Sequence, residues 1–161
     1  MREFGGIDAV INNASAISLT SLSETSTKRF DLMWDINVRG SFLLTTKCLP
    51  YLLKSHRYPH VLFMSPPLFA HRPEWFSGKV AYAGSKCGMS LWVLGMAEEL
   101  KGRVAVNGLW PKTLIATSAL QAINPTEFDA MSRQGRHPAI MADAAFLVLS
   151  QPLTFTGRGR F

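Results

Sequence analysis

Short apolar runs that alternate with long stretches of helical periodicity are the feature that most limits how this chain can fold. The runs at 7–11, 60–64 and 103–110 are each followed by turn residues, as is typical of buried strands. Apolar residues recur at helical spacing from Ser26 or Thr27 to about 55, and again over 79–100. This alternation predicts an α/β domain with a parallel sheet, and right-handed crossovers place helices on both of its faces.

Weaker helical periodicity is present near 126–132 and 142–149. Gly40 lies inside the first long helix, where glycine costs about 1 kcal/mol relative to alanine, so we expect close packing against a neighbour there. The chain has 161 residues, of which 47% are hydrophobic. It is therefore long enough for one compact domain, 1–161, and too short for two.

Charge and composition exclude several classes of protein. The net charge is +6, but the 17 lysines and arginines are scattered, and the densest group is the short run Arg158-Gly159-Arg160, so nucleic-acid binding is not predicted. The four histidines show no metal-ligand spacing, so we predict no metal site and expect them at the surface. The two cysteines are isolated, which favours a reducing compartment. No run approaches the ~18 consecutive apolar residues of a membrane span.

Unusual residues gather where the predicted strands end. The segments 12–15, 65–67 and 111–117 each follow an apolar run. In open parallel sheets, ligands bind beyond the carboxyl ends of the strands. The three segments therefore predict a site at that edge of the sheet.

Tyr82 and Lys86 are the residues best suited to chemistry in this region. They lie four positions apart near the start of a helix, so their side chains project from one face. An ammonium ~5 Å from a phenol favours the phenolate by ~3 kcal/mol at a dielectric near 20, which corresponds to roughly two pKa units. A phenol tuned in this way exchanges a proton with a carbonyl or alcohol oxygen. On spacing alone, an ordinary contact on the helix surface is the alternative.

Four motifs in a fixed order place this pair in a wider context. Asn12-Asn13-Ala14-Ser15 comes first, then Asn37-Val38-Arg39-Gly40, then Tyr82-Ala83-Gly84-Ser85-Lys86, and finally Val106-Asn107-Gly108-Leu109-Trp110-Pro111. From Gly5 to about Gly157 the chain resembles the short-chain dehydrogenase/reductase family. The resemblance implies a partial doubly wound, Rossmann-type parallel sheet with helices on both faces, lacking the N-terminal phosphate-binding half.

The resemblance also implies roles for individual residues. Tyr82 would be the proton donor or acceptor, and Lys86 would lower the pKa of Tyr82 and bind the nicotinamide ribose. Asn37 would lie in a helix distortion that holds a proton-relay water, and Asn12 would brace the strand end near the cofactor. The alternatives are a tolerated polar group within a helix for Asn37 and a turn residue for Asn12.

Three further positions are assigned to cofactor binding by the same resemblance. Ala14 belongs to the Asn-Asn-Ala motif, and Pro111 and Thr113 follow the third strand. The implied cofactor is NADP or NAD, and the implied partner is a small carbonyl or alcohol. The loop at 68–78, which includes Phe69, and the segment 114–123 are expected to shape an apolar pocket for a lipid-like or steroid-like molecule.

This sequence departs from the family pattern at two strand ends. The family commonly has Ser-Ser after the second strand here, whereas this chain has Ser65-Pro66. Ser65 is therefore either a substitute catalytic serine or an ordinary residue at a strand end. The familiar Asn-Asn-Ala-Gly reads Asn-Asn-Ala-Ser, so Ser15 adds bulk beside the expected ribose site.

A glycine-rich turn after a first strand, which would hold the cofactor pyrophosphate, is not present in the sequence. We therefore expect this chain alone to bind NAD(H) or NADP(H) weakly or not at all, and to be inactive by itself. One alternative is a non-enzymatic fragment that forms a homo-oligomer through its two long helices; another is an incomplete product without a stable fold. The stripe Met89, Trp92 and Met96 fits such an interface, although core packing is the alternative.

The expected cellular location rests on the resemblance alone. It implies a peroxisome or mitochondrion, while the chain itself shows no targeting signal and would otherwise be cytoplasmic.

Overall fold

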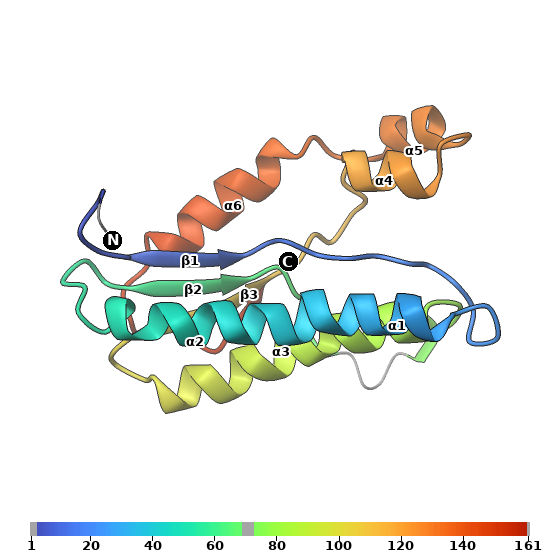
Figure 1. The fold of residues 1–161 in the computed structure, drawn as a ribbon. Coiled ribbons are helices and arrows are strands. Elements are labelled where there is room, and N and C mark those ends of the chain that lie inside the picture. Colours follow the sequence, from blue (N-terminus) through green and yellow to red (C-terminus); the bar gives the residue numbers. More distant parts are fainter. Residues whose placement is uncertain (1–2, 69–72, 161) are drawn as a thin grey trace.

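The computed structural model describes residues 3–68 and 73–160 as a parallel sheet between helices (Figure 1). The strands are β1 (Ala9–Asn12), β2 (His60–Phe63), β3 (Ala105–Leu109) and β4 (Gly159–Arg160). The helices are α1 (Thr27–Met33), η1 (Trp34–Gly40), α2 (Ser41–Leu52), η2 (Pro73–Trp75), α3 (Val80–Glu99), α4 (Ser118–Ile123), α5 (Phe128–Gln134) and α6 (Ala139–Leu149). The strands lie in the order β1-β2-β3-β4, and each neighbouring pair is parallel.

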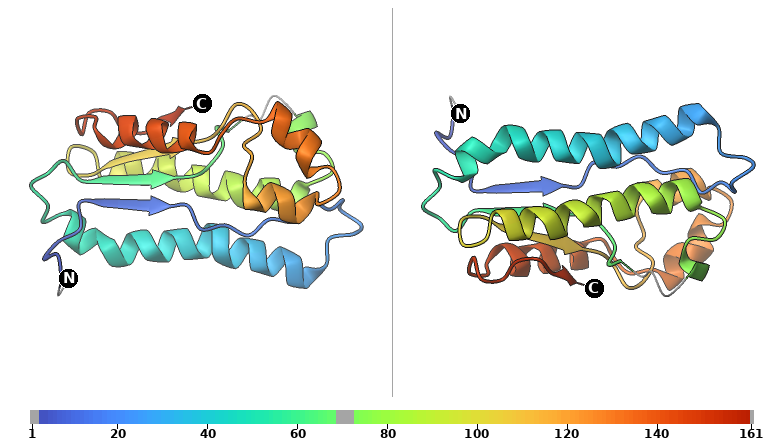
Figure 2. Two further views of the ribbon diagram at one scale, coloured as in Figure 1. Left: turned by 90° about the horizontal axis from the view of Figure 1, so that it is seen from above. Right: turned by 90° about the horizontal axis from the view of Figure 1, so that it is seen from below.

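Helices cover both faces of this sheet, as the sequence predicted. The continuous run of α1, η1 and α2 lies beside α3 on one face, and α6 packs on the other (Figure 2). The larger core cluster, between the sheet and α2 and α3, includes Leu52, Phe63 and Met89. A smaller cluster beneath α6 is formed by Leu62, Leu109 and Val148.

The burial of the strands follows from their positions in the sheet. Every residue of β2 and β3 is buried, because both faces are covered. At β1, which is an edge strand among those described, Val10 is 6% exposed but Ile11, on the other face, is 46% exposed. The described helices therefore cover only one face of β1, in agreement with a partial doubly wound sheet.

The three longer strands and the two long helical regions are confirmed. α5 and α6 account for the weaker periodicity near 126–132 and 142–149, whereas α4 was not anticipated. The expectation that all histidines lie at the surface was wrong for His60, which is 2% exposed and whose Nε2 lies 3.0 Å from the Gln151 carbonyl oxygen. Gly40 was expected to approach a neighbouring element, but a Cβ there would lie 3.1 Å from the carbonyl oxygen of Asp35 in its own helical run.

The first long helical region is not a single α-helix, because the residues of η1 form a π-helix between α1 and α2. π-helical turns are rare and are frequent at functional sites. The distortion brings Val38 against α3, where a Cβ on Gly88 would lie 3.0 Å from Val38 Cγ2. The missing side chain at Gly88 therefore permits the close approach of η1 and α3.

Core packing was one of the two interpretations of the stripe Met89, Trp92 and Met96 on α3. It is confirmed for Met89, which is fully buried against the sheet. Trp92 and Met96 are partly buried against the same cluster. Trp92 Nε1 also donates a hydrogen bond to the Val38 carbonyl oxygen at 3.1 Å. This stripe therefore holds α3 to the sheet and to η1.

Candidate active site

A cavity of about 540 Å³ lies beyond the carboxyl ends of β1, β2 and β3. Asn13 and Ser15, which follow β1, line it together with Met64, after β2, and Trp110, after β3. Because parallel strands end at the same edge, residues far apart in the sequence meet here. The cavity lies at the edge where the sequence predicted a site.

Tyr82 and Lys86 both line this cavity from the first turns of α3. Lys86 is only 3% exposed, and the phenol of Tyr82 is partly buried. Among the described residues, no hydrogen bond joins the Tyr82 hydroxyl to the Lys86 ammonium. The four-residue spacing therefore brings the two groups into one cavity without a direct bond between them.

The pKa of Tyr82 departs from the expectation based on spacing. Burial raises it to about 12, whereas the neighbouring ammonium was expected to lower it by roughly two units. The cause is burial, which withdraws the phenolate from water and so disfavours the charged form. The expected direction was therefore wrong for this structure.

Lys86 is perturbed by the same physical cause. Burial lowers its pKa to about 8, because the ammonium is poorly solvated. Lys86 Nζ donates a long hydrogen bond of 3.4 Å to Ser15 Oγ and lies 5.5 Å from the centre of the Trp110 ring. The hydroxyl and the ring face both stabilise the positive charge.

This pKa predicts a pH dependence of stability. Between pH 8 and about 10.4 the unfolded chain binds more protons at Lys86 than the folded chain does, so folding becomes more favourable as the pH rises. In urea titrations, the free energy of unfolding of the unmodified chain should rise between pH 8 and pH 10 by about 2 to 3 kcal/mol more than that of the Lys86→Met variant. Tyr82 acts oppositely only above about pH 10, where its unfolded form ionises first.

Lys101→Met provides the matched control, because Lys101 is exposed and pairs with Glu98 at the far end of α3. It should keep the pH dependence of the unmodified chain. Equal pH profiles for the unmodified chain and Lys86→Met would contradict a destabilised Lys86 ammonium.

Asn37 lies in the helix distortion that the resemblance implied, since it belongs to the π-helix η1. It is completely buried, and Nδ2 donates to the Ala16 carbonyl oxygen and to Ser85 Oγ, both at 2.9 Å. Its Oδ1 accepts from the Ala16 amide at 2.8 Å and from Ser15 Oγ at 3.0 Å. Asn37 thus fastens the segment after β1 to α3, and its role in holding a relay water stays a prediction.

Asn12 braces the end of β1 against α2, because its Nδ2 donates to Thr45 Oγ1 at 3.0 Å. The residue is 4% exposed, and its Oδ1 is a buried acceptor without a partner in the described part of the chain. An acceptor of this kind at a strand end is suited to a ligand or a water molecule.

The remaining predicted site residues fall into two groups. Pro111 lines the cavity, whereas Ala14 and Thr113 are exposed and do not line it. Ser65 is 1% exposed and lines a separate cavity of about 130 Å³. Its Oγ lies 3.1 Å from the position that a Cβ on Gly108 would occupy. The structure does not bring Ser65 to Tyr82, which favours an ordinary residue at a strand end.

The apolar wall predicted from the segment 114–123 is present. Leu114, Leu120 and Ile123 line the cavity, with α4 as its outer side. The loop at 68–78 was also expected to shape this pocket, but none of its described residues lines the cavity, and Phe69 lies outside the described residues. Sequence reasoning missed Ser85 as a partner of Asn37 and the ring of Trp110 as a partner of Lys86. Their places within the motifs around Tyr82 and Pro111 were the only available signal.

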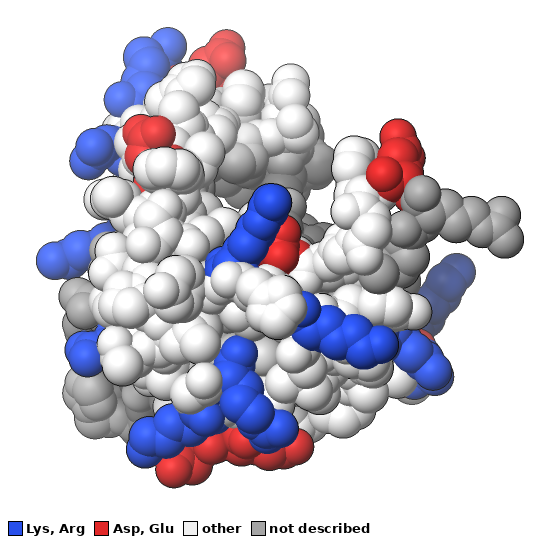
Figure 3. Space-filling view, turned by 90° about the vertical axis from the view of Figure 1, so that its left-hand side faces the viewer, with Lys and Arg blue, Asp and Glu red and all other residues white. Residues whose placement is uncertain are grey.

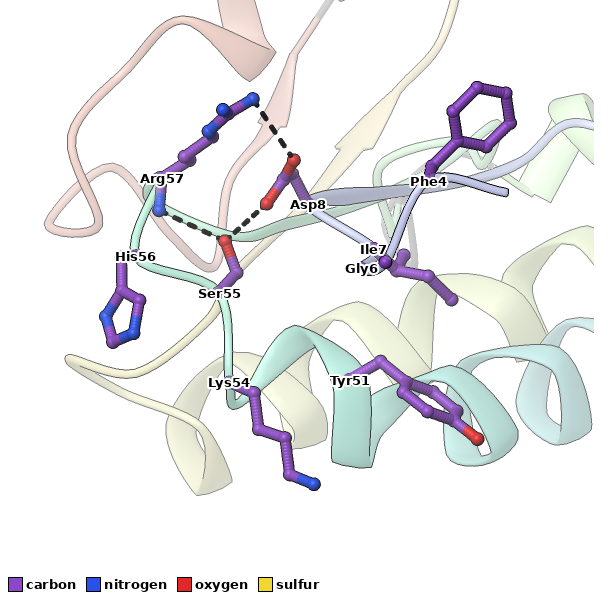
Figure 4. A pocket seen from close by; sticks show the side chains of 10 residues that line it. Phe4, Gly6, Ile7, Asp8, Tyr51, Lys54, Ser55, His56 and Arg57 are labelled. Carbon is purple, nitrogen blue, oxygen red and sulfur yellow. Dashed lines mark hydrogen bonds and ion pairs between the residues drawn. The ribbon is translucent and has the colours of Figure 1, made fainter. Parts of the chain in front are cut away.

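A second cavity, of about 290 Å³, lies at the opposite end of the sheet (Figure 4). Asp8 lines it, and its carboxylate accepts a hydrogen bond from Ser55 Oγ at 2.6 Å and pairs with Arg57 at 4.0 Å. Basic side chains are dispersed over this end of the molecule, with acidic ones between them (Figure 3). The strands begin here, so the carboxyl-end cavity is the better candidate for chemistry.

Comparisons with known proteins bear on the cavity that Tyr82 and Lys86 line. Residues 1–127 match the model of the short chain dehydrogenase family. Hydroxysteroid dehydrogenase-like protein 2 from Danio rerio is 49% identical over 158 residues, which are 98% of this chain and 37% of that protein. The chain therefore spans little more than a third of that relative.

Solved structures agree with the fold. A short chain dehydrogenase from Mycobacterium thermoresistibile is 43% identical, with a TM-score of 0.87 over 98% of this chain and 55% of that one. A short chain dehydrogenase from Shigella flexneri complexed with NADP shares the fold at 24% identity, with a TM-score of 0.84 over 98% of this chain and 64% of that one. In the part of the chain that the structure describes, no helix combines the length and apolarity needed to cross a bilayer.

Proposed function

Because this chain belongs to the short-chain dehydrogenase family, we propose that it carries the catalytic half of an oxidoreductase that interconverts a carbonyl and an alcohol with NADP or NAD. The observation that carries the proposal is the meeting of Tyr82 and Lys86 in one cavity beyond the carboxyl ends of the strands. Cavities at this edge are where open parallel sheets bind ligands.

Tyr82 is the proposed general acid in the direction of carbonyl reduction. With a pKa of about 12 the phenol is protonated at neutral pH and can donate its proton to the carbonyl oxygen. Lys86, with a pKa of about 8, carries its positive charge at the same pH. That charge stabilises the phenolate left by proton transfer, which then regains a proton from solvent. The nicotinamide, when bound, supplies the hydride.

The residues of the cavity fit the nicotinamide half of such a cofactor. An ammonium has three N–H donors, and among the described residues only Ser15 Oγ accepts a hydrogen bond from Lys86. Donors therefore remain for ribose hydroxyls, whereas Asn12, whose Oδ1 is a buried acceptor without a partner among the described residues, does not line this cavity. The NADP complex of the Shigella flexneri protein supports NADP as one cofactor to test.

The substrate class follows from the wall of the cavity. Leu114, Leu120 and Ile123 present an apolar surface in the same cavity as Tyr82 and Lys86. Such a wall suits a carbonyl compound with a lipid-like or steroid-like body. The family resemblance also underlies our expectation that the whole protein works in a peroxisome or mitochondrion.

A titration with NADPH tests the proposal. We expect no saturable enhancement of NADPH fluorescence with the 161-residue chain at micromolar concentrations, because its sequence has no glycine-rich turn for the pyrophosphate. A chimera in which this chain replaces its 158 matching residues in the Danio rerio relative should bind NADPH. Failure of the chimera to bind NADPH or NADH would contradict the proposed function, and micromolar binding by the chain alone would contradict the need for that turn.

A second candidate is an assembly of two copies through the long helices. Trp34, Phe42 and Trp92 line an open cavity of about 390 Å³ between η1, α2 and α3. Leu91 and Leu94 on α3 are more than half exposed. Neighbouring exposed apolar side chains of this kind are typical of an interaction site, so we propose that two or more copies of the chain associate through the long helices. Sedimentation of the chain as a monomer would exclude this assembly.

A further inference from the structure

The hydroxyl of Ser15 lies between two buried polar side chains, those of Asn37 and Lys86. Its Oγ is 3.0 Å from Asn37 Oδ1 and 3.4 Å from Lys86 Nζ. Ser15 stands where the family motif commonly has glycine, so the hydroxyl adds a polar group at this position.

The direction of the two hydrogen bonds is determined by chemistry. An ammonium can only donate, so Ser15 Oγ accepts from Lys86. The amide of Asn37 is fixed by the backbone of Ala16 and by Ser85, which leaves Oδ1 as an acceptor. The Ser15 hydrogen therefore points to Asn37 Oδ1 at 3.0 Å, which is nearer than the Ala16 carbonyl oxygen at 3.4 Å, and a lone pair of Oγ points to Lys86.

We infer that Ser15 is a positioning residue, whose hydroxyl holds the Lys86 ammonium toward the end of β1 and supports its charged form. The catalytic meaning of this inference rests on the proposed function, but the contact itself does not. Asn37 is completely buried and is anchored by three further hydrogen bonds to Ala16 and Ser85, so it holds the serine rotamer in place.

The surroundings of Lys86 make this hydroxyl important. Among the described residues, the ring of Trp110, whose centre lies 5.5 Å from Nζ, is the other group that stabilises the charge. Among the residues that line the cavity, Tyr82 and Lys86 are the titratable ones, and Tyr82 is neutral at neutral pH. Loss of the serine hydroxyl therefore removes a substantial part of the polar support for the ammonium.

The test is the titration of Lys86 in the 161-residue chain, followed by NMR of lysines labelled with carbon-13 at Cε and assigned with Lys86→Met. Ser15→Ala and Ser15→Gly should each lower the pKa of Lys86 by about half a unit to one unit, since a hydrogen bond to the charged form is lost. Ser15→Thr keeps the hydroxyl and should restore the original titration.

Ser18→Ala is the matched control, because Ser18 lies in the same segment but its Oγ contacts Thr20 and Arg29 instead of Lys86. Its Lys86 titration should equal that of the unmodified chain. If Ser15→Ala does not fold, Ser15→Gly and Ser15→Thr still decide the question. An unchanged Lys86 pKa in a folded Ser15→Ala or Ser15→Gly variant would overturn the inference. No cofactor or substrate is involved, so this outcome is independent of the proposed function.

Discussion

Tyr82→Phe is expected to lower kcat/KM of the NADPH-binding chimera by about 10²- to 10⁴-fold, the usual contribution of a positioned general acid. Phenylalanine keeps the ring and its packing at the start of α3 but removes the only proton that the residue can donate. The substrate would be an aldehyde or ketone with an apolar body, chosen to fit the wall of Leu114, Leu120 and Ile123. Initial rates of NADPH oxidation measure the effect.

Tyr51→Phe is the control for this substitution. Tyr51 is 37% exposed on α2 and lines the cavity at the opposite end of the sheet. Its loss of a hydroxyl should leave kcat/KM within about twofold, because surface changes away from the site are usually neutral. A Tyr82→Phe chimera with the activity of the Tyr51→Phe chimera would remove Tyr82 from the mechanism.

Asn37→Ala is expected to reduce the free energy of unfolding of the 161-residue chain by about 2 to 4 kcal/mol. The substitution leaves the Ala16 amide and carbonyl groups without their partner and opens a cavity in η1. Each buried polar group that loses its partner costs about 1 to 3 kcal/mol. Urea denaturation followed by circular dichroism measures the loss.

Asn13→Ala provides the comparison, because Asn13 is exposed and lies in the same segment. It should change the free energy of unfolding by less than about 0.5 kcal/mol. Asn37→Asp keeps the acceptor but removes the two donated bonds to Ala16 and Ser85, so it should be at least as destabilising as Asn37→Ala. If Asn37→Ala reduces the free energy of unfolding by less than about 1 kcal/mol, the Asn37 amide does not hold the segment after β1 against α3.

Much of the fold was predictable because its strands and helices depend on the spacing of apolar residues that are close together in the sequence. The apolar runs correspond to β1, β2 and β3, and the helical spacing corresponds to α2 and α3 with their neighbours. The π-helix is different, since it is defined by i→i+5 hydrogen bonds, and a segment of seven residues is too short for its period to be recognised in the sequence. Only the resemblance to a family indicated a distortion at Asn37.

The site was predictable where spacing decides which face a side chain occupies, and not where burial decides its chemistry. Tyr82 and Lys86 share a cavity as their spacing suggested, but burial reversed the expected direction of the Tyr82 pKa. Ser15 and Lys86 are 71 positions apart, and no local pattern links them. Similarly, the sequence could not show that Ser65 faces Gly108.

Transfer of deuterium to the reduced product from NADPH that carries deuterium at both C4 positions of the nicotinamide, followed by mass spectrometry, tests the proposed chemistry most directly. With the chimera, the alcohol should carry the deuterium, and Tyr82→Phe should yield almost none of this product. An alcohol without deuterium, or equal amounts of the labelled alcohol from both proteins, would contradict a hydride transfer assisted by Tyr82.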